Sequence, residues 1–191
     1  MAKYEVTGPW ERLAAETFKG LTGTQALLAR LDKALNKVKD ATLRGLIKAQ
    51  SVIHADMDRT PPKIPVEFDN LRSSYYCVTS NEAVIAGKNP TFTDTKRTAS
   101  GTLEKDHASV IQKSIANVVK RSKTYGPSVI FGFSAYYSTW VHENMSAENW
   151  TRKGSGAHFF AAAFKRNKNL VLKIIADDVK KQLASGRGSS K

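Results

Sequence analysis

Three prolines between residues 61 and 65 divide this chain. Proline cannot continue a helix, and it pushes the residue before it into extended geometry. Before this cluster, apolar residues recur at three- and four-residue steps from Leu27 to Met57, which is the period of an amphipathic helix. We therefore expect two consecutive helices, roughly 22–37 and 40–59, that the prolines bring to an end.

Short apolar runs after the prolines predict strands. Residues 75–79 are aromatic and β-branched, and 82–86 return after a tight turn, so the two runs predict a hairpin. A further strand is expected over 128–133. The stretch between the helices and the hairpin, residues 61–74, predicts an irregular connector.

The second half of the chain carries further helical patterns. One is expected over 103–122, with Thr102 as its cap, after a polar and exposed loop at 88–101. Ser134 is the expected N-cap of a short helix, and the last helix is expected over 157–184.

The order of these elements predicts an α+β fold. A small, mostly antiparallel sheet packs against a long N-terminal helical region and a C-terminal helix. Residues 1–20 predict an N-terminal arm, and 21–184 predict a single domain. The Gly-, Ser- and Lys-containing residues 185–191 predict a disordered basic tail.

The charge balance is strongly basic. The chain has 30 Lys and Arg against 17 Asp and Glu, a net charge of +13, which favours polyanions such as nucleic acid. Cys77 is the single cysteine, so no internal disulfide forms, and its apolar strand predicts an inert core thiol. The sequence shows neither a secretion signal nor a run long enough to span a membrane, so we expect the protein to act inside a cell.

The adjacent pair His142 and Glu143 is the first candidate for acid–base or metal chemistry. Neighbours on a helix do not face one another, and the H-E-x-x-H motif fails because Ser146 stands four residues after His142. The remaining histidines are far apart in the sequence: His54, His107 and His158. The sequence therefore predicts a structural histidine and no metal site.

Other catalytic patterns are missing as well. The chain has no Gly-x-Ser-x-Gly elbow and no phosphate-binding loop, and the adjacent Asp177 and Asp178 splay apart on a helix. We expect no catalytic residue and no cofactor. Two basic groups are candidates for contact with DNA or with an acidic partner: Lys120, Arg121, Lys123, Lys165, Arg166 and Lys168.

Two stretches carry a more specific signal. Residues 65–74, PVEFDNLRSS, resemble the P-V-D-T-G-N-L-R-x-S segment of the neck and tail-completion (head–tail joining) proteins of tailed bacteriophages. Phe68 and Asp69 depart from that segment, which has threonine and glycine there, so the geometry of this turn is open. Further on, residues 136–143 and 156–160 resemble the Y-A-x-x-V-H-E and G-A-x-F-L segments of the same family.

The resemblance covers roughly residues 20–184. Within this range, residues 88–124 are expected to be an insertion relative to the family. It implies structural roles for the motif residues Pro65, Asn70, Leu71, Arg72, Ser74, Tyr136, Val141, His142, Glu143, Gly156 and Phe159.

The family also implies a function. The chain would be a non-enzymatic virion protein, assembled in the host cytoplasm into a homo-oligomeric, hexameric ring at the head–tail junction. Its partners would be a portal-side connector or head-closure protein, a tail terminator or tail tube protein, and the double-stranded DNA that passes through the channel, with no membrane. Residues 1–20 and 88–101 are candidates for reaching neighbouring subunits. The alternatives are a tail terminator ring, a stand-alone basic DNA-binding protein, and a small nuclease or hydrolase.

Overall fold

The computed structural model describes residues 22–144 and 150–187. The predicted arm, residues 1–20, and the end of the predicted tail lie outside the described residues. The chain divides into two compact units, residues 1–38 and 39–191, and each is described by itself.

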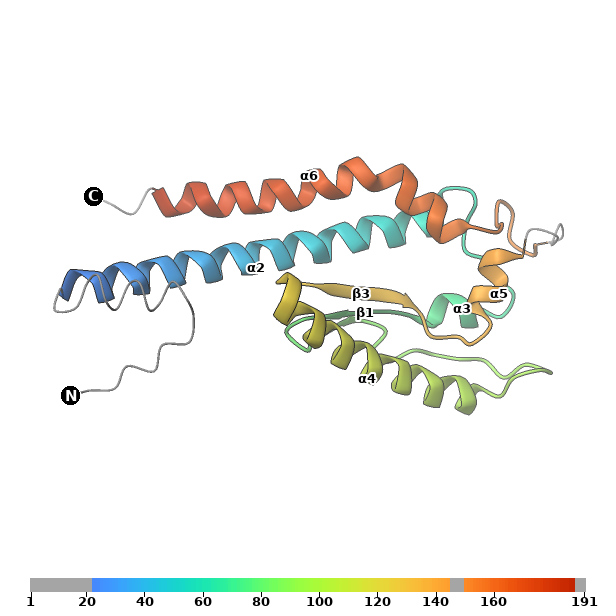
Figure 1. The fold of residues 1–191 in the computed structure, drawn as a ribbon. Helices are drawn as coiled ribbons and strands as arrows, with labels where there is room; N and C mark the ends of the chain where they lie inside the picture. Colours follow the sequence, from blue (N-terminus) through green and yellow to red (C-terminus); the bar gives the residue numbers. More distant parts are fainter. Residues whose placement is uncertain (1–21, 145–149, 188–191) are drawn as a thin grey trace. The chain divides into compact units, whose positions relative to one another are not determined.

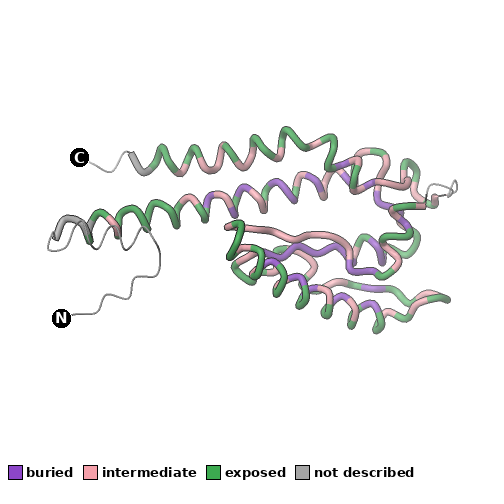
Figure 2. Tube along the Cα trace, viewed as in Figure 1, coloured by how far each residue is buried: buried purple, intermediate pink, exposed green. Residues whose placement is uncertain are grey.

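One helix, α2 (Thr22–Arg59), takes the place of the two predicted helices. The expected break near residue 38 is wrong because the polar stretch there contains neither glycine nor proline, and its lysines are good helix formers. Along α2 the residues change from exposed to buried (Figure 2). In the second unit its buried residues include Ala49, Ile53 and Met57.

The sheet has three strands in the order β2-β1-β3, all antiparallel. The predicted strand β1 (Tyr75–Thr79) is confirmed, β2 (Val84–Ala86) is shorter than expected, and β3 (Val129–Phe133) begins one residue later. The predicted connector contains a single helical turn, α3 (Asn70–Ser73).

The helices after the hairpin differ from the prediction at their starts. α4 (Ser100–Tyr125) has Ala99 as its N-cap, so Thr102 lies inside the helix and does not cap it. α5 (Ser138–Glu143) has Tyr137 as its N-cap, so Ser134 does not cap this helix either. The Ser134 hydroxyl is buried and lies 2.6 Å from His107 Nδ1.

The last helix, α6 (Phe159–Arg187), continues beyond the predicted end at residue 184. Its apolar side chains are only partly covered, because Phe164 is 47% exposed and Leu183 is 55% exposed. Among the described residues, no helix combines the length and the apolar character that crossing a bilayer requires.

Strand β1 is buried along its whole length because helices cover both faces of the sheet (Figure 1). Tyr75 and Cys77 point to one face and join a cluster with Ile53 and Phe159, while Val78 points to the other face, towards α4. The α+β class predicted from the sequence is therefore confirmed.

The segment 88–124, which resembles an insertion, contributes to both clusters. Phe92, Leu103 and Val118 within it are buried. The loop at its start is thus not simply exposed, because Phe92 anchors it to the core.

Candidate functional site

The chain around residues 63–74 and the chain around residues 134–156 meet in the fold. Lys63 forms an isolated parallel bridge with Ser155, and its carbonyl accepts a hydrogen bond from the Gly156 amide at 3.3 Å. A side chain at Gly156 would meet Pro62 Cβ at 3.1 Å, so glycine permits this close approach. Farther along, the Ser134 amide donates to the Ser74 carbonyl at 2.9 Å. These two parts of the chain, far apart in the sequence, are therefore neighbours in space.

Asp58, at the end of α2, links both stretches. Its carboxylate accepts from Arg72 Nη2 at 2.8 Å and from Arg152 Nη1 at 2.7 Å. Burial opposes ionisation of this carboxyl, but the hydrogen bond from Arg152 and the nearby positive charges outweigh it, so the pKa of Asp58 lies below its ordinary value. Neither Asp58 nor Arg152 belongs to a recognisable motif, and sequence reasoning missed both.

Asn70 fixes the loop that precedes α4. Its side chain is 4% exposed, donates to the Thr93 carbonyl at 2.8 Å and accepts from the Thr93 amide at 2.7 Å. Just before it, Asp69 has a φ of 61°, the left-handed conformation that glycine adopts most easily. Asp69 therefore adopts a left-handed backbone at this turn although it carries a side chain.

The other motif residues of the first stretch are buried. Ser74 is fully buried, and its hydroxyl donates to the Leu71 carbonyl at 2.7 Å. Leu71 belongs to the main core cluster, and Pro65 is also buried. These residues shape the turn from α2 to the sheet.

His142 and Glu143 do contact one another, contrary to the expectation for neighbours on a helix. Glu143 closes the short helix α5, and its Oε1 lies 2.6 Å from His142 Nδ1. The fold also brings His158 to this pair, with its Nδ1 3.6 Å from Glu143 Oε2. The histidines are far apart in the sequence, which argued against a cluster, but the tertiary structure brings His158 next to His142 and Glu143.

The backbone holds His158 beside the pair. His158 precedes α6 with a φ of 56°, and its amide donates to the His142 carbonyl at 2.7 Å. Phe159, 1% exposed, packs edge-on against the His142 ring at 5.2 Å between ring centroids. Val141, also buried, lies in the same core cluster.

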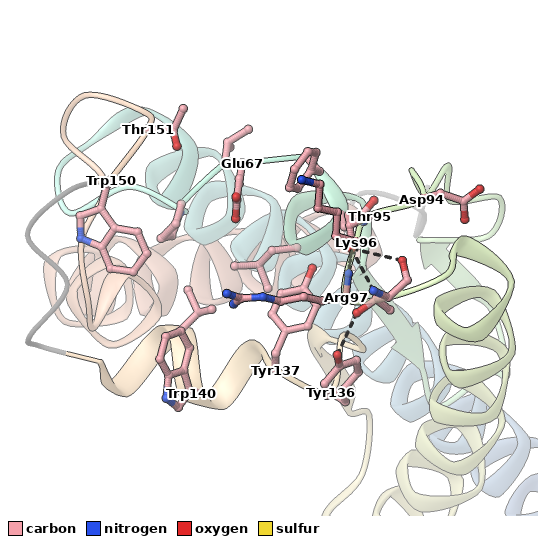
Figure 3. Close-up of a pocket in the computed structure, with 17 residues that line it drawn as sticks. Glu67, Asp94, Thr95, Lys96, Arg97, Tyr136, Tyr137, Trp140, Trp150 and Thr151 are labelled. Atoms are coloured by element: carbon pink, nitrogen blue, oxygen red, sulfur yellow. Dashed lines mark hydrogen bonds between the residues drawn. The ribbon is translucent and has the colours of Figure 1, made fainter.

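A cavity of about 880 Å³ opens next to both motif stretches (Figure 3). Aromatic side chains dominate one wall: Tyr136, Tyr137, Trp140 and Trp150. The opposite wall is built from residues 65–68, 70–71 and 94–98. Tyr136 is 62% exposed, and its hydroxyl lies 2.9 Å from Thr98 Oγ1. Tyr136 therefore contacts the loop before α4 at the edge of the cavity.

The basic candidates are dispersed and differ in their surroundings. Lys120, Arg121 and Lys123 lie exposed near the end of α4, and Lys165 and Lys168 lie exposed on α6. Arg166 instead binds Asp56 at 2.6 Å and the Pro61 carbonyl at 3.1 Å. Arg166 therefore ties α6 to the end of α2, which argues against its predicted contact with a partner.

Cys77 fulfils the prediction of an inert thiol. It is fully buried, and burial raises its pKa to about 12.

His54 is a buried titratable group next to this region. It stacks on Tyr75 with ring centroids 3.8 Å apart, and its Nε2 has no hydrogen-bond partner among the described residues. Burial lowers the pKa of His54 below 6.5, the Asp58 carboxylate opposes this shift, and Arg72 adds to it.

The lowered pKa of His54 predicts a pH-dependent stability. The unfolded chain binds a proton here below its ordinary pKa of 6.5 while the folded protein does not. The stability that neutral His54 contributes is therefore fully present above pH 6.5. It is lost as the pH falls from 6.5 through the lower pKa that His54 has in the folded protein. His54→Phe keeps an aromatic ring and removes the titration. Denaturant unfolding between about pH 5 and 7.5 should show a flatter pH dependence for the variant, and parallel curves would contradict this.

Comparison of the chain with family models, with curated proteins and with solved structures finds no match.

Proposed function

We propose that this chain is a structural subunit of a homo-oligomeric ring at the head–tail junction of a tailed bacteriophage. The resemblance of residues 65–74 and 136–160 to the neck and tail-completion family supports this proposal. The contacts of those residues are consistent with it, since Asn70 and Arg72 join separate segments of the chain. The ring is expected to be hexameric and to contact a connector or head-closure protein on one side and a tail protein on the other.

An apolar stripe on α2, exposed among the residues that the structure describes, is the observation that carries the proposal. Leu27, Leu31 and Leu35 follow one another at four-residue steps and are 61%, 50% and 50% exposed. Residues at this spacing share one helix face. A contiguous exposed apolar face marks an interaction surface more often than an isolated leucine does. A subunit that closes into a ring needs such a surface for its neighbour.

The basic charge fits the same setting in two ways. Five exposed candidates, Lys120, Arg121, Lys123, Lys165 and Lys168, would contact either the DNA in the channel or an acidic surface on an adjacent ring. A strongly attractive channel would slow the passage of DNA, because each phosphate contact adds salt-dependent affinity. We therefore assign much of the charge to protein contacts.

A stand-alone DNA-binding protein is the second candidate, favoured by the same five side chains. Retardation of linear duplex DNA by the purified chain, weakening steeply with added salt, would support it. A tail terminator ring is separated from a neck ring only by its position in the virion.

The stripe gives a direct test of the ring. The purified chain is expected to form closed rings, seen as a single mass in native mass spectrometry and as annular particles by electron microscopy. Leu31→Asp should weaken each contact by about 10- to 100-fold, since burying a leucine contributes about 1.5–3 kcal/mol.

Asn36→Asp is the matched control for this variant. It makes the same change in net charge on the same helix, at an exposed position outside the leucine stripe. Rings that survive Asn36→Asp but not Leu31→Asp support the proposal. A monomeric wild-type chain at every concentration tested, or annular particles equally tolerant of both changes, would argue against the role of this face. Localisation of the chain in intact virions by electron microscopy tests the position itself.

A further inference from the structure

We propose that His142, Glu143 and His158 form a binding site for one divalent transition-metal ion of the zinc class. Each residue offers one ligand atom, and the three atoms all lie within 4.8 Å of one another. This proposal is independent of the ring, since all three residues belong to one chain.

The three groups match the chemistry of such a cation. Imidazole nitrogen and carboxylate oxygen are common ligands of zinc, at bond lengths of about 2.0–2.2 Å. Two ligands of a tetrahedral ion with these bonds are separated by about 3.3 Å. His158 Nδ1 lies 3.6 Å from Glu143 Oε2, beyond an ordinary hydrogen bond and close to that separation. His142 Nδ1 lies 2.6 Å from the other carboxylate oxygen, Glu143 Oε1, and this hydrogen bond would be given up when His142 Nδ1 binds the ion.

The carboxylate lies between the two rings. One oxygen contacts His142 and the other faces His158, and the ring centroids of the two histidines are 5.4 Å apart. A shared cation gives all three groups a common partner.

The backbone at His158 supports a specific role for its side chain. A φ of 56° is uncommon for a residue with a Cβ, although histidine adopts it more often than most residues do. Strained residues of this kind are concentrated at functional sites. The left-handed backbone here places an imidazole beside Glu143.

The surroundings also position the His142 ring. Phe159 packs against it at 5.2 Å, and the Ala161 amide points to its Nε2 at 3.4 Å. Binding through Nδ1 requires the proton of this imidazole to lie on Nε2, so the long contact from Ala161 would be given up. Glu143 and His158 are 58% and 42% exposed, so an ion reaches the site from solvent and water completes its coordination.

The bound ion would connect the end of α5 to the start of α6. These helix ends lie on either side of residues 144–158 in the sequence. We infer a site that stabilises this junction, as metals do when their ligands come together only in the folded chain.

The experiment uses the full chain without a polyhistidine tag, stripped of metal by a chelator that is then removed. Calorimetric titration with zinc chloride is expected to give one ion per chain. Thermal denaturation should show a higher midpoint with zinc than with the chelator. Cobalt(II) provides a second probe, because its visible absorption reports the ligand set directly.

Two variants remove one ligand each with little risk to folding. Glu143→Gln changes an exposed side chain, and His158→Asn keeps a residue that tolerates the left-handed backbone. Each should weaken zinc binding by at least about 100-fold. Replacing a residue that only supports a ligand already costs up to about 100-fold, and these variants remove a ligand itself. Glu104→Gln, an exposed carboxylate on α4, is the matched control and should bind as the wild type does.

The outcomes separate the site from a hydrogen-bonded cluster. Loss of binding in Glu143→Gln and His158→Asn, with circular dichroism spectra like that of the wild type, supports the site. Absence of zinc binding to the wild type, or binding that both variants retain, overturns the proposal.

Discussion

Replacing Phe159 by alanine is expected to lower the free energy of unfolding by about 3–5 kcal/mol. Phe159 is 1% exposed and belongs to the main core cluster. Its ring packs edge-on against Phe133 and against His142. The truncation removes a large buried side chain where the sheet, α5 and α6 meet, and the close packing there limits how far neighbours can refill the space. Urea denaturation measures the loss.

Phe164→Ala is the matched control for this prediction. It is the same chemical change on the same helix, at a residue that is 47% exposed. We expect it to cost about 1 kcal/mol or less, because little buried area is lost. Similar losses for the two variants would show that the junction at Phe159 is not a packed core.

Gly45→Val is expected to destabilise the protein by about 2–3 kcal/mol, within the range for overpacking a close contact. A Cβ at Gly45 would lie 2.8 Å from Ile175 Cα, which is closer than such atoms approach in proteins. The pair of helices would have to separate at this point. That movement would also strain the nearby contacts of Lys48 with Asp178 at 2.7 Å and of Arg44 with Gln182 at 3.0 Å.

Gly101→Val tests whether the effect comes from the close approach. Gly101 also lies in a helix, near the start of α4, and a Cβ there meets nothing within 4 Å. We expect a change within about 0.5 kcal/mol for this variant, as for other surface substitutions. If Gly101→Val lowers the free energy of unfolding as much as Gly45→Val does, the effect comes from placing valine in a helix and not from the contact between the two helices. Thermal and urea unfolding of both variants distinguish the two explanations.

Local patterns were sufficient to predict most of the secondary structure. The aromatic and β-branched run at Tyr75–Thr79 was predicted correctly because a strand of this composition has few alternatives. The structure differs from the prediction where the sequence carries only weak signals for the ends of helices. Polar residues near position 38 do not interrupt α2, and Ser134 uses its hydroxyl for His107 instead of a helix end.

The candidate site was predictable only in part. The motifs singled out Asn70, Arg72, His142 and Glu143, and the structure shows each of them making specific contacts. No pattern connected them with Thr93, Asp58 or His158. Such partners come from segments whose separation along the chain carries no information about their distance in space.

The sequence by itself determined the class of fold and the order of its elements, because helix and strand periods are local properties of the chain. It also determined the burial of Cys77 and the basic character of the surface. Only the tertiary structure decided that Asp58 joins Arg72 to Arg152 and that His158 meets His142 and Glu143. The physical reason is that these contacts depend on how the loops and helix ends pack, and packing is a property of the whole chain rather than of any one segment.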